Sequence, residues 1–370
     1  MKLNIPDNIA TIIPYPPGKP LDELEREYGI TDSIKLASNE NPWGPSPKAV
    51  EAIKGSLAGL HRYPDGSAYY LTEAVARWMG SGMDEIVLGN GSNEIIEFLT
   101  KAFVMPGDTV ITSHPSFLMY QKFVQVRGGE NKVVPLRDMR HDLGEIARLV
   151  TDSTRLIFID NPNNPCATFI DAEEFETFIK QLPETVIVVL DEAYVDFVRP
   201  EERIDVLSYI RKPEGRAAVV ALRTFSKAFG LAGLRIGFGL MHPEIANLLH
   251  RVRQPFNVNL PAQEGALAAL ADTGHYNMTL NTTRSERKRL QEEVTKLGCD
   301  AYPSETNFFL IDVQGDANTL YEAMLHKGVI VRSMSAYGYP NFIRITIGTE
   351  AENDRFLHAF AQTLTELGYV

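Results

Sequence analysis

The chain has 370 residues, 44% of them hydrophobic, and carries a net charge of −12. This length is sufficient for a large domain together with a smaller one. The acidic balance and the lack of a basic stripe argue against a nucleic-acid partner, so any anionic ligand must be held by a local cluster of cations and backbone N–H groups.

The composition also disfavours several kinds of site and location. Two cysteines, Cys166 and Cys299, are too few for a disulfide framework or a cysteine-built zinc site, and we expect no metal. No segment approaches the ~18 apolar residues that span a bilayer. Residues 1–13 lack the long apolar run of a signal peptide. We therefore expect a cytoplasmic enzyme that has no membrane partner.

The first 45 residues are rich in proline and glycine, and they predict an extended arm with one short helix near residues 21–28. After the arm, short apolar runs alternate with helical patterns. The runs predict strands at 86–88, 109–112, 156–159, 186–190, 218–222 and 236–240, and the helical patterns between them include 92–104, 173–181 and 244–251. Such alternation is typical of a mostly parallel sheet with helices on both faces.

The pattern changes near residue 255. Helices are predicted at 262–271 and 278–297, followed by a strand at 308–313, a helix at 317–326, a strand at 342–347 and a final helix from residue 351. This order predicts a second α+β unit. The expected organisation is an N-terminal arm at 1–45, a large domain at 46–255 and a small C-terminal domain at 256–370.

A glycine-rich turn joins the first predicted strand to the helix after it. Gly89 and Gly91 allow tight curvature, and the helix start at Ser92 and Asn93 offers free N–H groups to a phosphate. Glu94 stands where a dinucleotide-binding fingerprint has its third glycine, which disfavours an NAD-dependent dehydrogenase. A plain helix capped by Ser92 is an equal alternative.

Three more polar groups follow predicted strands. Lys227 comes shortly after one strand, with Arg235 eight residues later, and this arrangement suits a Schiff-base lysine with a phosphate clamp. Asp191 ends another strand, where a carboxylate can keep a pyridine nitrogen protonated, and Asn164 lies in a proline-bounded turn after a third. The ordinary alternatives are a surface lysine, a helix cap and a plain turn. Parallel strands would nevertheless bring Asn164, Asp191, Lys227 and Arg235 to one edge of the sheet, together with the turn at Gly91–Asn93.

Taken together, these stretches resemble the histidinol-phosphate aminotransferases, which are class II aminotransferases in the fold type I family of pyridoxal-phosphate enzymes. The similarity covers nearly the whole chain. Its markers are SNENP at 38–42, RYPD at 62–65, GNGSNE at 89–94, NPNNP at 161–165, DEAY at 191–194, RTFSK at 223–227, LAGLR at 231–235, QPFNVN at 254–259 and IRITIGT at 343–349. The resemblance implies an α/β fold like that of aspartate aminotransferase, with a large mostly parallel α/β/α sheet domain and a smaller α+β C-terminal domain.

The resemblance also implies how pyridoxal 5′-phosphate would be bound. Lys227 would hold the cofactor as a Schiff base and move the substrate proton, with Asp191 and Tyr194 as the other catalytic residues. Further cofactor contacts would come from Gly91, Ser92, Asn93, Phe117, Asn164, Thr224, Ser226 and Arg235. Tyr63 would reach the cofactor phosphate from a second subunit, which implies a homodimer.

The reaction that the resemblance implies is transamination between histidinol phosphate and 2-oxoglutarate in histidine biosynthesis. An amino donor and a 2-oxo acid would then be the small-molecule partners, bound by Tyr15, Asn41, Arg332 and Arg344. A phosphate calls for more cationic donors than a carboxylate does, and two arginines fit that need.

Three other functions are compatible with parts of this pattern. An aromatic amino-acid aminotransferase on the same scaffold stays open. The SNENP stretch favours an aminotransferase over a threonine-phosphate decarboxylase. A cofactor-sensing transcription regulator would need a DNA-binding segment, and the proline-rich arm is too short to be one.

The chain departs from the family pattern after NPNNP, where Cys166 and Ala167 replace the usual Thr-Gly. Because alanine disfavours positive φ, this replacement bears on the geometry of the turn near Asn164. No activating base is evident near Cys166 in the sequence, so we expect a small buried residue and not a nucleophile.

Overall fold

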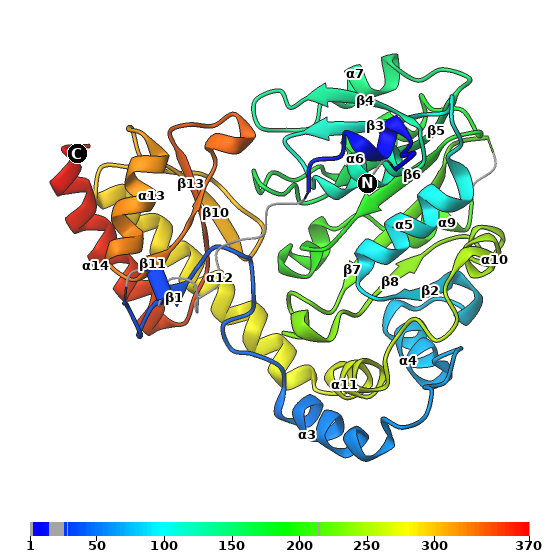
Figure 1. The fold of residues 1–370 in the computed structure, drawn as a ribbon, viewed down its shortest axis with the longest axis horizontal. Coiled ribbons are helices and arrows are strands. Elements are labelled where there is room, and N and C mark those ends of the chain that lie inside the picture. Colours follow the sequence, from blue (N-terminus) through cyan, green and yellow to red (C-terminus); the bar gives the residue numbers. More distant parts are fainter. Residues whose placement is uncertain (1–2, 15–25, 28, 213–214, 370) are drawn as a thin grey trace.

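Two sheets of different size organise the residues that the structure, a computed structural model, describes: 3–14, 26–27, 29–212 and 215–369. The strands of the larger sheet are β2 (Ile86–Gly89), β3 (Thr109–His114), β4 (Glu130–Pro135), β5 (Thr154–Asp160), β6 (Ile187–Asp191), β7 (Ala218–Thr224) and β8 (Gly237–Leu240). In space they follow the order β2-β8-β7-β6-β5-β3-β4, and every strand except β8 runs in the same direction (Figure 1).

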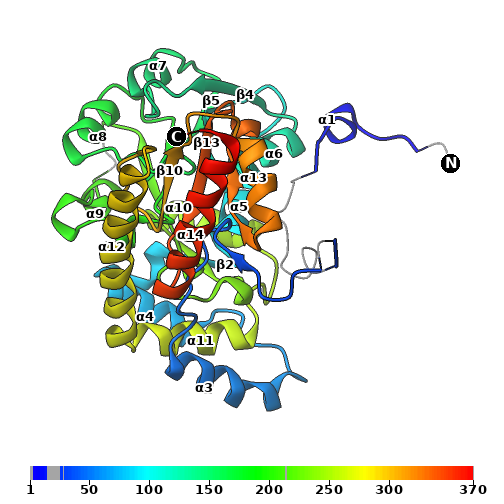
Figure 2. The same cartoon turned by 90° about the vertical axis from the view of Figure 1, so that its left-hand side faces the viewer.

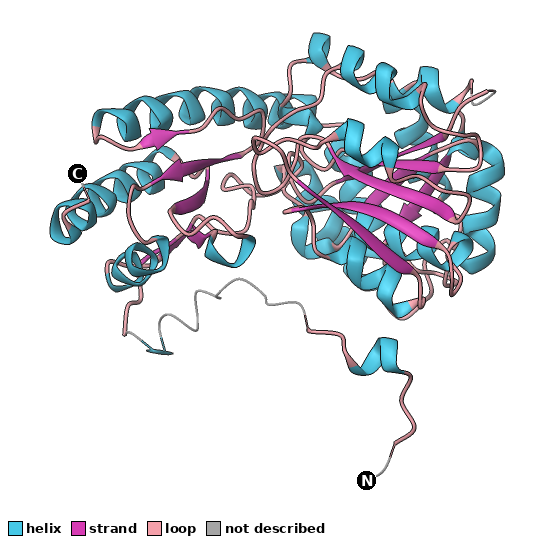
Figure 3. Cartoon of the chain, turned by 90° about the horizontal axis from the view of Figure 1, so that it is seen from above, coloured by secondary structure: helices cyan, strands magenta, loops and turns pink. Residues whose placement is uncertain are grey.

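The middle strands of this sheet are apolar along most of their length because helices cover both of their faces (Figure 3). One face packs against α5 (Ser92–Phe103), α6 (Met119–Val126) and α10 (Pro243–Val252). The other packs against α4 (Tyr69–Met79), α7 (Leu143–Arg148), α8 (Ala172–Ile179), α9 (Val206–Ile210) and α11 (Leu260–Leu270), and α3 (Pro47–Ser56) lies on α11. In the described part of the chain, no helix is both long and apolar enough to cross a membrane.

The smaller sheet is antiparallel, with the order β12-β13-β10-β9. Its strands are β9 (Asp300–Ala301), β10 (Phe308–Asp312), β12 (Arg332–Ser333) and β13 (Phe342–Thr346). Three helices cover it, α12 (Thr273–Lys296), α13 (Ala317–His326) and α14 (Glu350–Leu367), which Figure 2 shows on the outer side of this unit. The largest side chains of its core, Phe309, Phe356 and Phe360, are fully buried.

The N-terminal segment reaches both parts of the molecule. The short helix α1 (Asp7–Ala10) lies against α6, where Asn8 Nδ2 donates to the Gln125 carbonyl at 3.0 Å. Farther along, β1 (Ile34–Lys35) pairs in parallel with β11 (Val329–Ile330) of the smaller unit. Short 3-10 turns complete the described structure at Leu57–Gly59, Met83–Glu85, Val195–Phe197, Pro200–Glu202, Ala232–Leu234 and Ser335–Tyr337.

This architecture confirms the predicted fold class, and all six predicted strands of the large sheet are present. The sequence patterns missed β4, because an edge strand exposed along most of its length has no apolar run. They also missed β12, which has only two residues. The helix predicted near 21–28 falls almost entirely outside the described residues. We keep the three-part division as a proposal, since the seven-stranded sheet lies within 46–255 and the four-stranded sheet within 256–370.

Candidate active site

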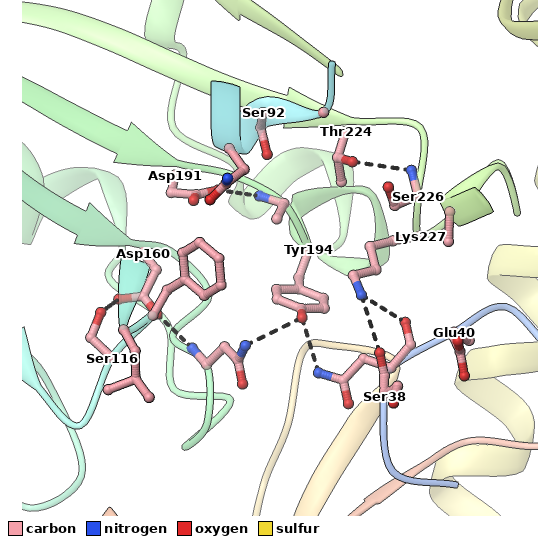
Figure 4. Close-up of a pocket in the computed structure, with 18 of the residues that line it drawn as sticks. Ser38, Glu40, Ser92, Ser116, Asp160, Asp191, Tyr194, Thr224, Ser226 and Lys227 are labelled. Atoms are coloured by element: carbon pink, nitrogen blue, oxygen red, sulfur yellow. Dashed lines mark hydrogen bonds between the residues drawn. The ribbon is translucent and has the colours of Figure 1, made fainter. Parts of the chain in front are cut away.

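A cavity of about 300 Å³ opens at the carboxyl ends of β5, β6 and β7 and is closed on its other side by the smaller unit (Figure 4). Parallel pairing places Asp160 beside Asp191 and Asp191 beside Leu222, so the strand ends share one edge of the sheet. Most of the predicted site residues line this cavity: Gly91, Ser92, Asn93, Phe117, Asn164, Asp191, Tyr194, Thr224, Ser226, Lys227, Arg235, Arg332 and Arg344.

Three predicted site residues are not in this lining. Asn41 uses its side-chain amide to donate to the Ala228 carbonyl at 3.1 Å, so it supports the loop after Lys227 from behind. Tyr63 is 82% exposed, and its ring stacks on Phe256 at a centroid distance of 4.8 Å. Tyr15 lies outside the described residues.

Lys227 points into the cavity and is not a surface lysine. Its Nζ donates to the carbonyl of Asn39 at 3.0 Å and to that of Ser38 at 3.4 Å. Burial, assisted by the positive charge of Arg344, lowers the pKa of Lys227 to about 8. A lysine with this pKa supplies a neutral, nucleophilic amine near neutral pH.

Asp191 is a buried carboxylate at the end of β6. Its Oδ2 accepts from the Tyr120 hydroxyl at 2.8 Å and its Oδ1 from the Ala193 N–H at 3.1 Å. Burial, with the nearby charge of Asp160, raises the pKa of Asp191 to about 7. A carboxylate in this state is stabilised by a cation brought into the cavity, and a protonated ring nitrogen is such a cation.

Tyr194 lies between Asp191 and the smaller unit. Its hydroxyl accepts from Asn39 Nδ2 at 2.9 Å and from Asn164 Nδ2 at 3.5 Å, which leaves the hydroxyl proton to donate in turn. Burial raises the pKa of Tyr194 to about 12, so the proton stays on the phenol at neutral pH. Lys227 Nζ lies 5.5 Å from the centre of the Tyr194 ring.

The start of α5 forms a cradle for an anion. The N-cap of α5 is Gly91, at φ 80°, and Ser92 is the first residue of the helix. Within the described chain no side chain caps this helix, so the alternative of a helix capped by Ser92 is wrong. A Cβ on Gly91 would lie 2.7 Å from Arg235 Nη2, which shows how closely that guanidinium approaches the helix start. Asn93 Oδ1 is buried without a hydrogen-bond partner among the described residues. Free N–H groups, the positive helix end and an arginine together fit a phosphate.

Two arginines face the opposite end of the cavity. Arg332 and Arg344 are directly opposed across the β12–β13 pair, and both line the cavity. Arg344 Nη2 donates to the Ala37 carbonyl at 2.9 Å, and Nη1 donates to the side chain of Asn164. Arg332 has no ion-pair partner in the described part of the chain. Like charges placed directly opposite each other destabilise a sheet unless an anion lies between them.

Comparison with known proteins agrees with this geometry. The family model described as aminotransferase class I and II matches residues 31–360. The chain belongs to the class I and II aminotransferases. It is 65% identical over 370 residues to the histidinol-phosphate aminotransferase of Desulfotalea psychrophila, covering 100% of this chain and 98% of the relative. It is 45% identical to the same-named protein of Moorella thermoacetica, covering 96% and 92%.

Solved structures show the same relationship. The crystal structure of histidinol-phosphate aminotransferase from Sinorhizobium meliloti, in complex with pyridoxal-5′-phosphate, matches this aminotransferase with a TM-score of 0.91 and 28% identity over 99% of both chains. Aspartate aminotransferase from Thermus thermophilus with maleate, at 22% identity and a TM-score of 0.81, shows the shared fold.

The structure adds site residues of this aminotransferase that the sequence patterns did not single out. Tyr120 binds Asp191 from α6, Asn39 binds Tyr194 from the N-terminal segment, and Asp160 lines the cavity beside Asp191. Tyr120 follows Phe117 by three residues and lies in the first turn of α6, and its closeness to Phe117 in the sequence was the available signal. Asn39 lies within the SNENP stretch, which marked the family without giving the residue a role.

The turn after NPNNP accommodates the two unusual residues in a hydrogen-bonded conformation. Ala167 adopts the left-handed conformation at φ 62°, and its N–H donates to the Asn163 carbonyl at 2.9 Å. Cys166 is 1% exposed, and burial raises the pKa of its thiol to about 12, which confirms the prediction of a small buried residue.

Proposed function

We propose that this aminotransferase transfers the amino group of histidinol phosphate to 2-oxoglutarate with pyridoxal 5′-phosphate as its cofactor. Two relatives that match nearly the whole chain carry the name histidinol-phosphate aminotransferase, and a similar structure holds pyridoxal-5′-phosphate. The proposal places the chain in histidine biosynthesis and, as the sequence led us to expect, in the cytoplasm.

Different residues of the cavity would bind different parts of this cofactor. Lys227 would attach to it, Asp191 would keep its ring nitrogen protonated, and Phe117 would lie on its ring face. The cradle at the start of α5, completed by Thr224, Ser226 and Arg235, would bind its phosphate. When bound, pyridoxal phosphate supplies an electron sink for negative charge on the substrate Cα. Lys227 would then remove and return the proton at that carbon.

The main support for histidinol phosphate as the substrate is the opposed pair of Arg332 and Arg344. A carboxylate can be held by one arginine fork, whereas a phosphate with a charge near −2 can neutralise two. The whole chain is acidic, so a phosphorylated donor gains nothing from the overall field and must be captured locally. The phosphate of histidinol phosphate, placed between the two guanidinium groups, would remove their mutual repulsion.

Substitution of Arg332 tests this proposal. Losing one charge-assisted contact typically costs ~1.5–3 kcal/mol, so in Arg332→Ala we expect kcat/KM for histidinol phosphate to fall roughly 10- to 150-fold. The kcat/KM for glutamate and phenylalanine should fall much less. Arg251→Ala, in which an exposed arginine of α10 is removed, is the matched control and should change none of them. Equal losses for every donor, or a wild-type preference for phenylalanine, would favour an aromatic amino-acid aminotransferase.

The proposed enzyme is a homodimer in which Tyr63 completes the site of the neighbouring subunit. Its support is the exposure of several large apolar side chains within residues 57–70 and at Phe256, whose ring stacks on Tyr63, which is unusual for a surface that faces only water. These exposed side chains are Leu57, Leu60, Tyr63, Tyr69, Tyr70 and Phe256.

A further inference from the structure

Asp160 is a second buried carboxylate of the cavity, and the proposed function assigns it no task. It ends β5 directly beside Asp191 of β6, and only 4% of its surface is exposed. Two buried carboxylates at one strand edge repel each other, and the charge of Asp160 contributes to the raised pKa of Asp191. The other contacts of Asp160 must therefore offset its repulsion from Asp191.

Those contacts come from three separate segments that converge on the carboxylate. The Ser116 hydroxyl donates to Oδ1 at 2.7 Å from the loop after β3. The Asn164 N–H donates to Oδ2 at 2.8 Å, and Asn163 Nδ2 lies 3.2 Å from Oδ1 in the same turn. His141 Nε2 lies 3.2 Å from Oδ1 and reaches it from the loop after β4.

The imidazole of His141 is itself fixed on both sides. Its Nε2 lies 3.0 Å from the Asp160 carbonyl as well as near the carboxylate, so this nitrogen carries the donated proton. Its Nδ1 lies 2.7 Å from the Ser113 hydroxyl, which then donates to it. A neutral imidazole satisfies all of these contacts. The ring is buried, so its orientation is set by the protein and not by solvent.

Two of the three segments that contact Asp160 carry a residue that lines the cavity. Ser116 precedes Phe117, which lines the cavity and packs edge-on against Tyr120 at 5.4 Å. Asn164 contacts Tyr194 with its side-chain amide and accepts from Arg344 with its side-chain oxygen. Asp160 thus holds, through the Ser116 hydroxyl and the Asn164 N–H, the two segments that would meet the ring face and the ring hydroxyl.

We propose that Asp160, oriented by His141, is a positioning residue that fixes Phe117 and Asn164 around the cofactor ring. This inference rests on the proposed function, since it takes pyridoxal phosphate as the ligand. It goes beyond the proposed function because it assigns a role to a carboxylate and an imidazole that would touch neither the Schiff base nor the ring nitrogen.

Asp160→Asn tests the assignment because it keeps the size of the side chain while replacing one acceptor oxygen with a donor. We measure the dissociation constant of pyridoxal phosphate for the cofactor-free protein, and the circular dichroism of the visible band of the bound cofactor. We expect the dissociation constant to rise roughly 10- to 100-fold, in keeping with the loss of hydrogen bonds to a charged group. The visible dichroism should fall by about half or more, because a loosely held ring loses its asymmetric surroundings; a purely structural role would leave this signal in place.

Glu85→Gln is the matched control. Glu85 is another buried carboxylate, at the end of the 3-10 turn that precedes β2; it pairs with Arg211 at 3.0 Å and is not part of the cavity lining. Its loss should lower thermal stability without changing the cofactor affinity or the visible dichroism.

The outcomes separate this inference from the proposed function. If the wild-type protein binds no pyridoxal phosphate, the proposed function fails and this inference fails with it. If the wild type binds and folded Asp160→Asn binds equally well with unchanged dichroism, only the positioning role is overturned. Should Asp160→Asn not fold, Ser116→Ala removes a single donor: a rise of roughly 3- to 10-fold in the dissociation constant supports the role, and an unchanged value overturns it.

Discussion

Replacing Asp191 with asparagine should stabilise the cofactor-free protein while it destroys catalysis. Among the residues that the structure describes, the carboxylate has two hydrogen-bond donors, Tyr120 and the N–H of Ala193, and burial raises its pKa from 3.8 to about 7. A shift of about three units corresponds to ~4 kcal/mol that the folded protein loses by keeping this group charged. Asparagine has the same shape and no charge, so it avoids that cost.

The pH dependence follows from the direction of the shift. Because the folded pKa lies above the unfolded value, the contribution of Asp191 to stability is complete below 3.8 and is lost as the pH rises through about 7. Asparagine does not titrate. Between about pH 5.5 and about pH 8.5, the free energy of unfolding of Asp191→Asn should therefore rise by about 2 kcal/mol relative to the wild type.

Urea unfolding of both cofactor-free proteins at these two pH values measures the difference. With pyridoxal phosphate bound, the order should reverse, because the ring nitrogen then pairs with the wild-type carboxylate, and turnover by the variant should fall by several orders of magnitude. A stability difference that is the same at both pH values would mean that Asp191 does not titrate near pH 7 in the folded protein, and a variant whose turnover stays within about tenfold of the wild type would exclude the role of Asp191 in catalysis.

Three more predictions concern the cofactor site. The rate at which the cofactor-free protein attaches pyridoxal phosphate, measured by stopped-flow absorbance, should rise with pH to about 8 and then level off, because the neutral amine of Lys227 is the nucleophile. A rate that keeps rising toward pH 10.5 would contradict this. Gly91→Ala should weaken cofactor binding roughly tenfold or more by displacing Arg235. Gly80→Ala is the control, because Gly80 has a similar φ of 70° and open space around the Cβ, so this substitution should lower stability alone. Equal cofactor affinities of the two variants in an equilibrium titration would exclude the start of α5 as the phosphate site. Mixed dimers of Lys227→Ala and Tyr63→Ala subunits should regain activity that neither parent has, since one site is then intact, and no recovery would place Tyr63 in its own subunit's site.

The sequence was sufficient to predict most of the fold and the main residues of the cavity. Five successive apolar residues before Asp191 mark a buried strand, and parallel strands necessarily end at the same edge. The strand pattern therefore predicts that Asp191, Lys227 and Asn164 lie at one edge of the sheet. The resemblance to known enzymes then supplied their roles, which composition and periodicity do not contain.

Other parts of the site depend on tertiary contacts that leave no local pattern. The opposition of Arg332 and Arg344 depends on the pairing of a strand only two residues long, which is too short to be read from periodicity. The contact between Tyr120 and Asp191 joins residues 71 positions apart. Ala167 takes a positive φ that its residue type disfavours, because the hydrogen bonds of the turn hold it there.

If the paired arginines recognise a phosphate on the amino donor, removal of that phosphate must weaken catalysis. The measurement is kcat/KM for histidinol phosphate and for the same donor without its phosphate. Losing a phosphate that pairs with both Arg332 and Arg344 costs ~2–5 kcal/mol, so we expect a preference of at least about 30-fold for the phosphorylated donor. Equal values for the two donors would contradict it.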